Sequence, residues 1–257
     1  MIQAAGAFKF YMGFLKGRKE NDCPGITYSH SIKGIEVYNN IIQNVGYDGI
    51  QIKNADEDCE VYANVIKGYG SKNENPHNEG LFIGEGVTGK FYSNLIMNGT
   101  GNGIQFQGMG NNDIFNNIVA NSGQHGFFGA HGEQVVRLEN GYFNIFNNTI
   151  YNSKEIGFVF YNDDGGEKRF INNIVAKAGQ LNPNGATLVA SNNIITNDTG
   201  PIKLSNPGKG DMRLGAGSSA INAGFDVRTY LGELNFDFEG SNRPKGVSFD
   251  IGAIEKE

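Results

Sequence analysis

The chain of 257 residues has no tryptophan, two cysteines, six prolines and four histidines. Two cysteines without a CxxC spacing exclude a disulfide framework and argue against a structural zinc site. No apolar run approaches the roughly 18 residues of a membrane-spanning helix, and no signal peptide with a charged start and an apolar core opens the sequence. The formal net charge of -6 argues against a nucleic acid or an anionic membrane as partner, because both attract basic surfaces.

The dominant feature is a repeat of alternating apolar and polar residues, followed by Asn and two aliphatic or β-branched residues. Its seven copies are IEVYNNII (35–42), CEVYANVI (59–66), KFYSNLI (90–96), DIFNNIV (113–119), FNIFNNTI (143–150), RFINNIV (169–175) and ASNNII (190–195). The aligned asparagines are 24, 30, 23, 31, 25 and 20 residues apart, which is one solenoid coil each: Asn40, Asn64, Asn94, Asn117, Asn148, Asn173 and Asn193.

We expect each of these asparagines to adopt the left-handed backbone conformation that bends a strand sharply. Their amides can hydrogen-bond from one coil to the next, which predicts an internal asparagine ladder. A second landmark is a glycine that opens another short strand in five coils, at Gly49, Gly80, Gly103, Gly126 and Gly157.

Three short strands per coil with a period of two predict an all-β fold, a right-handed parallel β-helix of about seven rungs. We expect residues 1–200 to form the rungs and residues 201–257 to form a C-terminal capping segment of the same domain. Before the first repeat, Gly25–Ser29 is predicted as the opening strand of an earlier rung. Residues 1–17 are predicted as a partial rung or a cap, and their apolar part also suits a strand.

Three strings near the end of the chain are SSAINAGFD (218–226), FDFEGSNRP (236–244) and FDIGAIE (249–255). Together they resemble the C-terminal segment of many secreted bacterial β-helix repeat proteins, whose superfamily includes polysaccharide lyases and mannuronan epimerases. The resemblance implies a secreted or cell-surface protein with a polysaccharide as partner. A terminal cap is also needed physically, because the last rung would otherwise expose unpaired strand edges. Four charged residues are therefore interpreted mainly as cap residues, with bound Ca²⁺ as the alternative: Asp226, Asp237, Asp250 and Arg243.

Aligning the glycine-led strands places side chains in columns along one sheet, about 4.8 Å apart. The residues directly before the glycines are Asp48, Glu79, Asn102, His125 and Ile156. Alternation turns the residues one and three positions after each glycine inward and the residue two positions after it outward. That outward column contains Gln51, Phe82, Gln105, Phe128 and Val159, and Lys53, Gln107 and Tyr161 follow two residues on. Exposed aromatic rings between amides suit a sugar, so we expect the floor of a groove here.

Two insertions border the same sheet, Ser71–His77 before its second strand and His131–Glu139 after its fourth. Long loops on a rigid scaffold commonly carry function. His77, His125 and His131 all fall in this region. Taken singly, however, Asp, Asn and His before a glycine are also ordinary turn residues, and the phenylalanines could pack beneath the loops.

Two enzyme families of this fold resemble parts of the pattern. Asp48-Gly49, Glu79-Gly80 and His125-Gly126 are similar to the turns of polygalacturonase-type hydrolases, although the chain has an extra rung with Asn102, one acid at the second turn and no Arg-x-Lys strand. The run NPHNEGLFIGEG (75–86) resembles the acidic, His-containing turn of mannuronan epimerases and of alginate and chondroitin lyases. Those enzymes carry a Lys and an Arg on the rungs that follow. This chain has Gln105 or Gln107 in place of the Lys, and Ala130-His131 in place of the Arg.

The leading hypothesis is a lyase or C5-epimerase that acts on a uronate-containing polysaccharide, because both reactions need a base and a neutralised carboxylate. His125 or His77 would be the base, and Asp48, Glu79 and His131 complete the catalytic candidates. Lys53, or Ca²⁺ held by Asp48, Glu79 or Glu85, would balance the substrate carboxylate. The expected substrate-binding residues are Gln51, Phe82, Gln105, Gln107, Phe128 and Tyr161. The alternatives are a polygalacturonase-like hydrolase and a non-catalytic module that binds glycans through Phe82, Phe128 and Tyr161.

Overall fold

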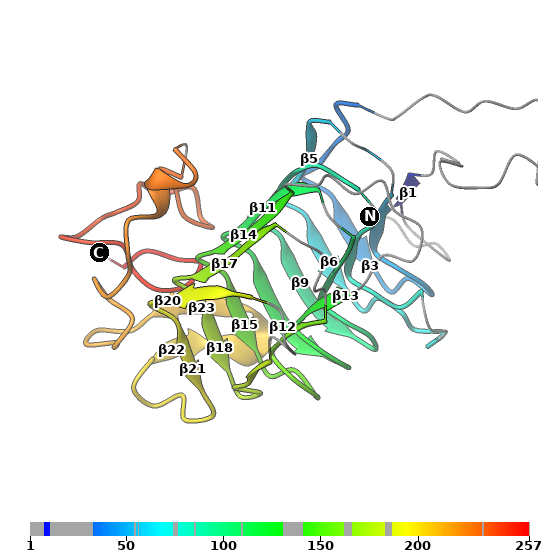
Figure 1. Ribbon diagram of the computed structural model, residues 1–257. Helices are drawn as coiled ribbons and strands as arrows, with labels where there is room; N and C mark the ends of the chain where they lie inside the picture. The colour runs from blue at the N-terminus through cyan, green and yellow to red at the C-terminus, as the bar shows by residue number, and fades with distance from the viewer. Residues whose placement is uncertain are drawn as a thin grey trace, which may run out of the picture.

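The computed structural model contains three parallel sheets of seven strands each, wound as a right-handed parallel β-helix. Figure 1 shows the strands stacked along the solenoid, with the N-terminal strands and the C-terminal segment at opposite ends. None of the described helices is long and apolar enough to cross a membrane. The structure describes residues 8–10, 33–53, 55, 57–73, 77–84, 86–108, 110–130, 141–161, 166–182, 187–232 and 234–256.

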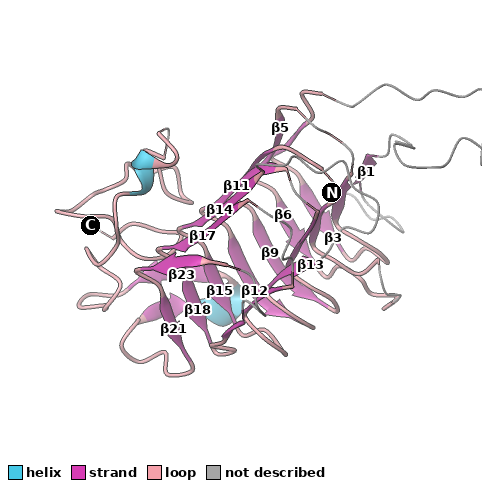
Figure 2. Ribbon diagram, viewed as in Figure 1, coloured by secondary structure: helices cyan, strands magenta, loops and turns pink. Residues whose placement is uncertain are grey.

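Every rung contributes one short strand to each sheet, so strands of one sheet recur at every third position in the chain (Figure 2). Sheet 1 consists of β1 (Phe8–Phe10), β4 (Ile50–Ile52), β7 (Leu81–Ile83), β10 (Ile104–Gln107), β13 (Phe127–Ala130), β16 (Phe158–Phe160) and β19 (Leu181–Asn182). Sheet 2 consists of β2 (Glu36–Tyr38), β5 (Cys59–Tyr62), β8 (Gly89–Tyr92), β11 (Asn111–Phe115), β14 (Tyr142–Phe146), β17 (Glu167–Ile171) and β20 (Val189–Ser191). Sheet 3 consists of β3 (Ile41–Gln43), β6 (Val65–Lys67), β9 (Leu95–Gly99), β12 (Ile118–Ser122), β15 (Thr149–Tyr151), β18 (Ile174–Ala176) and β21 (Ile194–Thr196).

Each copy of the sequence repeat covers the corner between sheet 2 and sheet 3. The predicted asparagine ladder is confirmed: every ladder Asn donates its Nδ2 to the Oδ1 of the next, over 3.0 to 3.2 Å, from Asn40 to Asn193. Most of these amides also donate to a backbone carbonyl, as Asn117 does to Phe91. The ladder therefore satisfies the polar groups at a corner that is buried along most of its length.

The left-handed backbone conformation lies one residue earlier than expected. The residues with φ between 50° and 60° at this corner are Asn39, Ala63, Ser93, Asn116, Asn147, Asn172 and Asn192. The expectation that the ladder asparagines themselves make the bend is wrong. The preceding residue bends the chain, and the ladder side chain is thereby left pointing inward, where it reaches the neighbouring rung.

The glycines before the sheet 1 strands form a column that leaves no room for a side chain. A Cβ at Gly49 would lie 2.6 Å from the carbonyl oxygen of Gly80 and 2.5 Å from Cγ2 of Ile66. The same clash recurs at Gly80, Gly103 and Gly126. The residues one and three positions after these glycines are buried in the main core, as predicted, with Ile50 and Phe106 among them.

At the N-terminus, β1 pairs in parallel with β4, so that Phe8 lies opposite Ile50. Part of residues 1–17 thus forms a strand of the solenoid, in agreement with a partial rung. The strand expected at Gly25–Ser29 lies outside the described residues.

The C-terminal segment, residues 201–257, which the sequence predicts to be a cap, lies along the side of the solenoid and continues none of the three sheets. It contains β22 (Leu204–Asn206), η1 (Pro207–Lys209), β23 (Asp211–Leu214) and η2 (Val227–Thr229), and its one hairpin is separate from the solenoid. Apolar cap residues pack on the outer face of sheet 3 and on aromatic residues of sheet 2. The left-handed asparagines of four successive rungs donate to cap carbonyls: Asn116 to Phe236, Asn147 to Asp250, Asn172 to Phe225 and Asn192 to Ala223.

The charged residues assigned to the cap hold its own backbone together. Arg243 and Glu255 form an ion pair of 2.8 Å with both side chains fully buried. Asp237 accepts hydrogen bonds from the backbone of Glu239 and Ser241, and Asp250 accepts from Asn222 and Lys256. Asp226 accepts from the Arg228 backbone at the start of η2. These contacts support the structural interpretation, and no group of three metal-ligating side chains occurs among the described residues.

Replacing Asn117 by Ala removes two hydrogen bonds donated to Phe91 and Asn148 and two accepted from Asn94. We expect the free energy of unfolding to fall by roughly 1 to 3 kcal/mol, because neighbouring amides are left unsatisfied in a buried corner. Asn193 at the end of the ladder exchanges hydrogen bonds with one ladder neighbour, so Asn193→Ala should cost less. Thermal melts of both variants check this, and equal melting temperatures near that of the unmodified chain would contradict the ladder's role.

Candidate functional site

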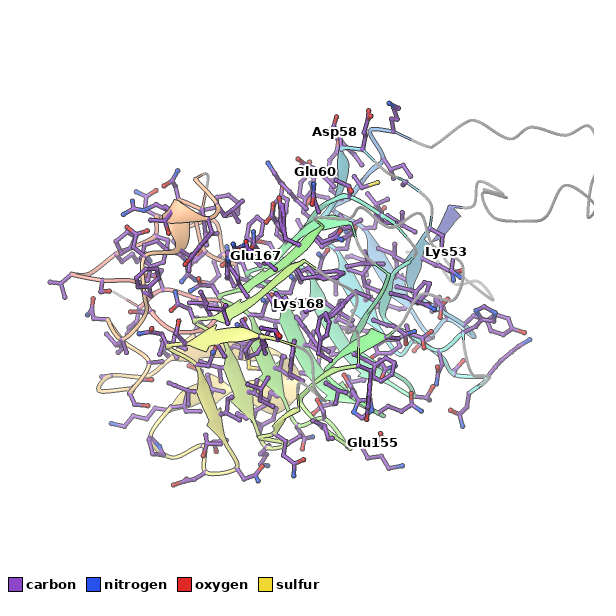
Figure 3. All side chains as sticks on the ribbon, in the orientation of Figure 1. Lys53, Asp58, Glu60, Glu155, Glu167 and Lys168 are labelled. Carbon is purple, nitrogen blue, oxygen red and sulfur yellow. The ribbon has the colours of Figure 1, made fainter. Side chains whose placement is uncertain are left out.

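The side chains at the start of the sheet 1 strands form two adjoining columns. Strand pairing aligns Gln51, Phe82, Gln105, Phe128 and Val159 in the predicted register. In two of these rungs the residue before the glycine contacts the residue two positions after the glycine. The amide of Asn102 donates to Gln105 over 2.9 Å, and the rings of His125 and Phe128 stack 5.2 Å apart. The two columns therefore make one continuous patch, with Lys53 and Glu155, both labelled in Figure 3, on its first and last rungs.

Asp48 and Glu79 form a buried acidic pair on neighbouring rungs, 0% and 2% exposed. The backbone N–H of Glu79 donates to Oδ1 of Asp48 over 3.0 Å, and the backbone N–H of Asn78 donates to the Glu79 carboxyl group. Burial, followed by the adjacent Asp48 carboxyl group, raises the pKa of Glu79 to about 9. Glu79 consequently keeps its proton at neutral pH, since burial disfavours its charged form.

His77 lies at the edge of this pair. Its Nδ1 is 3.7 Å from Oδ2 of Asp48, and its side chain is 39% exposed, whereas that of Asp48 is fully buried. Within the described part of the chain, Asp48 Oδ2, His77 Nδ1 and Gln51 Oε1 are buried without a hydrogen-bond partner. A partly exposed imidazole beside a buried carboxyl group is the arrangement in which a carboxylate orients a general base. Such contacts are often long in the absence of substrate.

His125 has a polar contact at each of its ring nitrogens. Nδ1 accepts from the backbone N–H of Ile156 over 3.2 Å, and Nε2 lies 3.1 Å from the Glu155 carboxylate. Burial lowers the pKa of His125, and Glu155 opposes that shift. A neutral imidazole in this setting carries its proton on Nε2 and has its lone pair on Nδ1 already engaged. The geometry therefore suits a hydrogen-bond donor better than the general base proposed from the sequence.

The expectation of exposed aromatic rings in the outward column is wrong for Phe82, which is 4% exposed. The Lys53 side chain reaches over it from the preceding rung, with Nζ 5.0 Å from the ring centroid. Gly84 makes this possible, since a Cβ there would lie 2.6 Å from Cγ of Lys53. Gln51, Gln105 and Val159 are buried as well. Phe128 is half-buried between His125 and Tyr161, so Tyr161, 36% exposed, is the open aromatic residue of the predicted set.

The two insertions fall between strands at the positions that the sequence indicates, and the second of them lies outside the described residues. Chain segments of more than ten residues separate β6 from β7 and β13 from β14. His77 comes from the first and joins the acidic pair. His131 and Glu85, predicted as a catalytic residue and a metal ligand, lie outside the described residues. Gln107 ends β10 on the same face, half-buried.

Glu155 was missed by the sequence reasoning, although it contacts His125. Glu155 lies two residues before Gly157, whereas the aligned columns begin with the residue directly before each glycine. Aligning one more residue on that side would have included Glu155. For a metal, no three His, Cys, Asp or Glu side chains gather among the described residues. The partnerless Asp48 oxygen beside Glu79 nevertheless matches the oxygen donors that Ca²⁺ prefers.

No protein-family model matches the chain, and no curated protein matches its sequence. Among solved structures, the fold is similar to that in "Crystal structure of pectate lyase Pel9A", with a TM-score of 0.51 and 18% sequence identity. The match covers 88% of this chain and 66% of that one, so the chain spans slightly less than two thirds of that protein's length. At this identity the likeness establishes the architecture, which is that of a parallel β-helix.

Proposed function

We propose that the chain acts on a uronate-containing polysaccharide at the start of the sheet 1 strands, by β-elimination or C5 epimerisation. The observation that carries this proposal is the partly exposed His77 imidazole beside the buried Asp48–Glu79 pair. The fold likeness to a pectate lyase supports the same substrate class. Such polysaccharides lie outside the cell, so the proposal also places the protein there.

Both reactions begin with removal of the proton on C5, next to the uronate carboxylate. His77 is the base in this scheme: its imidazole takes the C5 proton, and the carboxyl group of Asp48, 3.7 Å from Nδ1, stabilises the imidazolium that forms. Burial and the adjacent Asp48 carboxyl group raise the pKa of Glu79, so Glu79 retains its own proton beneath the histidine. In β-elimination the C4–O4 bond then breaks and the leaving oxygen takes up a proton. In epimerisation a proton returns to C5 from the opposite face.

The electron pair left on C5 must be delocalised into the uronate carboxylate. The negative charge that builds up on this carboxylate must be stabilised by a cation. Lys53, whose Nζ lies over the ring of Phe82, is a cation of this patch among the described residues and would supply that charge. Asp48 and Glu79 would hold a Ca²⁺ ion, which when bound supplies the same neutralisation and offsets the repulsion between an acidic protein and a polyanion. His125, with both nitrogens engaged, positions Phe128 and the rung that carries it.

The activity is tested by incubating the protein with alginate, pectate and chondroitin, with and without Ca²⁺. We expect unsaturated chain ends, seen by ultraviolet absorbance, or inversion at C5, seen by NMR, on one of these substrates. His77→Ala should lower kcat by roughly 100-fold or more, the size of a general-base contribution. His125→Gln is the matched control and should lower it only a few-fold. Absence of both products from all three substrates, or a large loss confined to His125→Gln, refutes the scheme.

The protonated state of Glu79 makes stability depend on pH. Its pKa is raised in the folded chain from 4.5 to about 9, so between these values the folded state binds a proton that the unfolded state has released. Raising the pH through this window therefore lowers the free energy of unfolding, by up to about 1.4 kcal/mol per pH unit. Glu79→Gln is neutral throughout and lacks this loss. Its melting temperature should match the unmodified chain near pH 4.5 and exceed it increasingly towards pH 9, and a constant difference would contradict the buried proton.

Binding of Ca²⁺ to the pair would compete with that proton. Added Ca²⁺ should accordingly raise the melting temperature more at pH 8 than at pH 5, and Glu79→Gln should reduce the increase. Mg²⁺ at the same concentration controls for ionic strength. An increase that is independent of pH, or unchanged in Glu79→Gln, would place any bound ion elsewhere.

A further inference from the structure

A second candidate binding surface lies on the outer face of sheet 2, away from the site on sheet 1. A cavity of about 430 Å³ extends over five neighbouring strands there, from β2 to β14. Its lining residues come from these strands and from the turns directly before them, and the space beside Gly34 is open where another residue would carry its side chain. Figure 3 shows Asp58 and Glu60, two of the lining residues, along this edge of the solenoid.

Tyr142 lines the groove, and beside it on the same strands runs an aromatic column formed by Tyr38, Tyr62, Tyr92 and Phe115. Their rings stack 4.8 to 4.9 Å apart and are nearly parallel. The C-terminal cap covers the far part of the column, where Phe236 contacts Tyr92 and Phe115. Tyr38 remains 46% exposed. Because the ring faces cover one another, the open part of the column presents ring edges and hydroxyl groups.

The floor is a charged column in strand register, consisting of Glu36, Glu60, Lys90 and Asp113. Beyond the cavity the same column continues with Asn144 and Arg169. Its members are fixed by one another and by the tyrosines. Tyr92 donates to Glu60 over 3.3 Å, Asn144 donates to Asp113 over 2.8 Å, and Arg169 donates to Asn144 over 3.0 Å. Asn111, at the rim, has a buried Oδ1 without a hydrogen-bond partner among the described residues. The groove thus offers fixed donors and acceptors on successive rungs.

The tyrosines act as donors over a wide pH range. Burial and nearby carboxyl groups raise the pKa of Tyr62, Tyr92 and Tyr142 above the usual value of a phenol. Carboxylates provide acceptors, and Lys90 provides a further donor group. A sugar hydroxyl both donates and accepts, so a polyhydroxylated chain can use both kinds of partner.

The charges that line the cavity determine which polyhydroxylated ligands it can bind. Glu36, Asp58, Glu60 and Asp113 line the cavity, whereas Lys90 is its one cation among the described residues. This acidity disfavours uronates and phosphates. Strands about 4.8 Å apart also repeat their side chains at a spacing close to the length of one sugar unit in an extended chain.

We propose that this groove binds a linear neutral oligosaccharide along the solenoid axis, separately from the uronate site on sheet 1. The chain then has one surface for a charged glycan and another for a neutral one. Binding in this groove involves no catalytic residue of sheet 1. A test of this binding is therefore independent of the proposed lyase or epimerase activity.

Isothermal titration calorimetry with cellohexaose as the probe tests the groove. Glu60→Leu, which removes the central acceptor, should weaken binding by about tenfold or more. Glu60→Gln keeps the shape and one acceptor oxygen and should remain within about threefold of the unmodified chain. Tyr161→Ala, on sheet 1, should leave cellohexaose binding unchanged. Lys90→Leu is the second groove variant and is used if melting curves show that Glu60→Leu fails to fold.

Two further ligands set the outcomes that would overturn the proposal. A hexamer of galacturonate should not bind the groove, so any binding of it must be insensitive to Glu60→Leu. A glucosamine hexamer measured at low and high salt tests for simple attraction to acidic side chains. Failure of cellohexaose to bind, equal weakening by Tyr161→Ala, or binding of the glucosamine hexamer alone with loss in high salt, each refutes a neutral-glycan groove.

Discussion

The asparagine ladder is the interaction on which the rest of the molecule depends. It joins all seven rungs through one buried column of amides, from Asn40 to Asn193. A ladder amide reaches its neighbour only if adjacent rungs stay in register, so extra residues in a coil must leave the solenoid as loops. Coil lengths of 20 to 31 residues are therefore compatible with three regular sheets. The same constraint turns single outward residues into continuous columns, and both candidate sites consist of such columns.

The periodic parts of the structure could be predicted because each is repeated many times in the sequence. The ladder asparagines, the glycine column and the inward residues such as Phe106 follow from alignment of the coils alone. The sequence predicts the left-handed bend at the ladder asparagine, one residue later than in the structure. The reason is that several copies have Asn at both positions of the corner, as in Asn116-Asn117. In the second and third copies Ala63 and Ser93 take the left-handed position, which shows that the ladder, and not the bend, requires Asn.

The parts of the candidate site that could not be predicted depend on contacts between rungs. Phe82 is buried because Lys53 crosses it from the preceding rung over the space left by Gly84. Both ring nitrogens of His125 have polar partners because Ile156 and Glu155 come from the following rung. The alignment of the coils places Asp48 and Glu79 next to each other in one column. It does not indicate that both side chains are buried, and this burial keeps a proton on Glu79. The tyrosine column on sheet 2 was present in the repeat as well, but alternation made it look like ordinary solvent-facing strand residues.

The C-terminal segment changes how such a solenoid loses its structure. A stack of rungs joined only to nearest neighbours behaves as a one-dimensional array, in which a terminal rung can open without the others. Here one segment is hydrogen-bonded to Asn116, Asn147, Asn172 and Asn192, on four consecutive rungs. Opening any of these rungs disturbs the segment's contacts with the other three, so this half of the molecule behaves as one cooperative block. The N-terminal rungs, from β2 to β5, make no such contacts among the described residues, and local opening is therefore concentrated at that end.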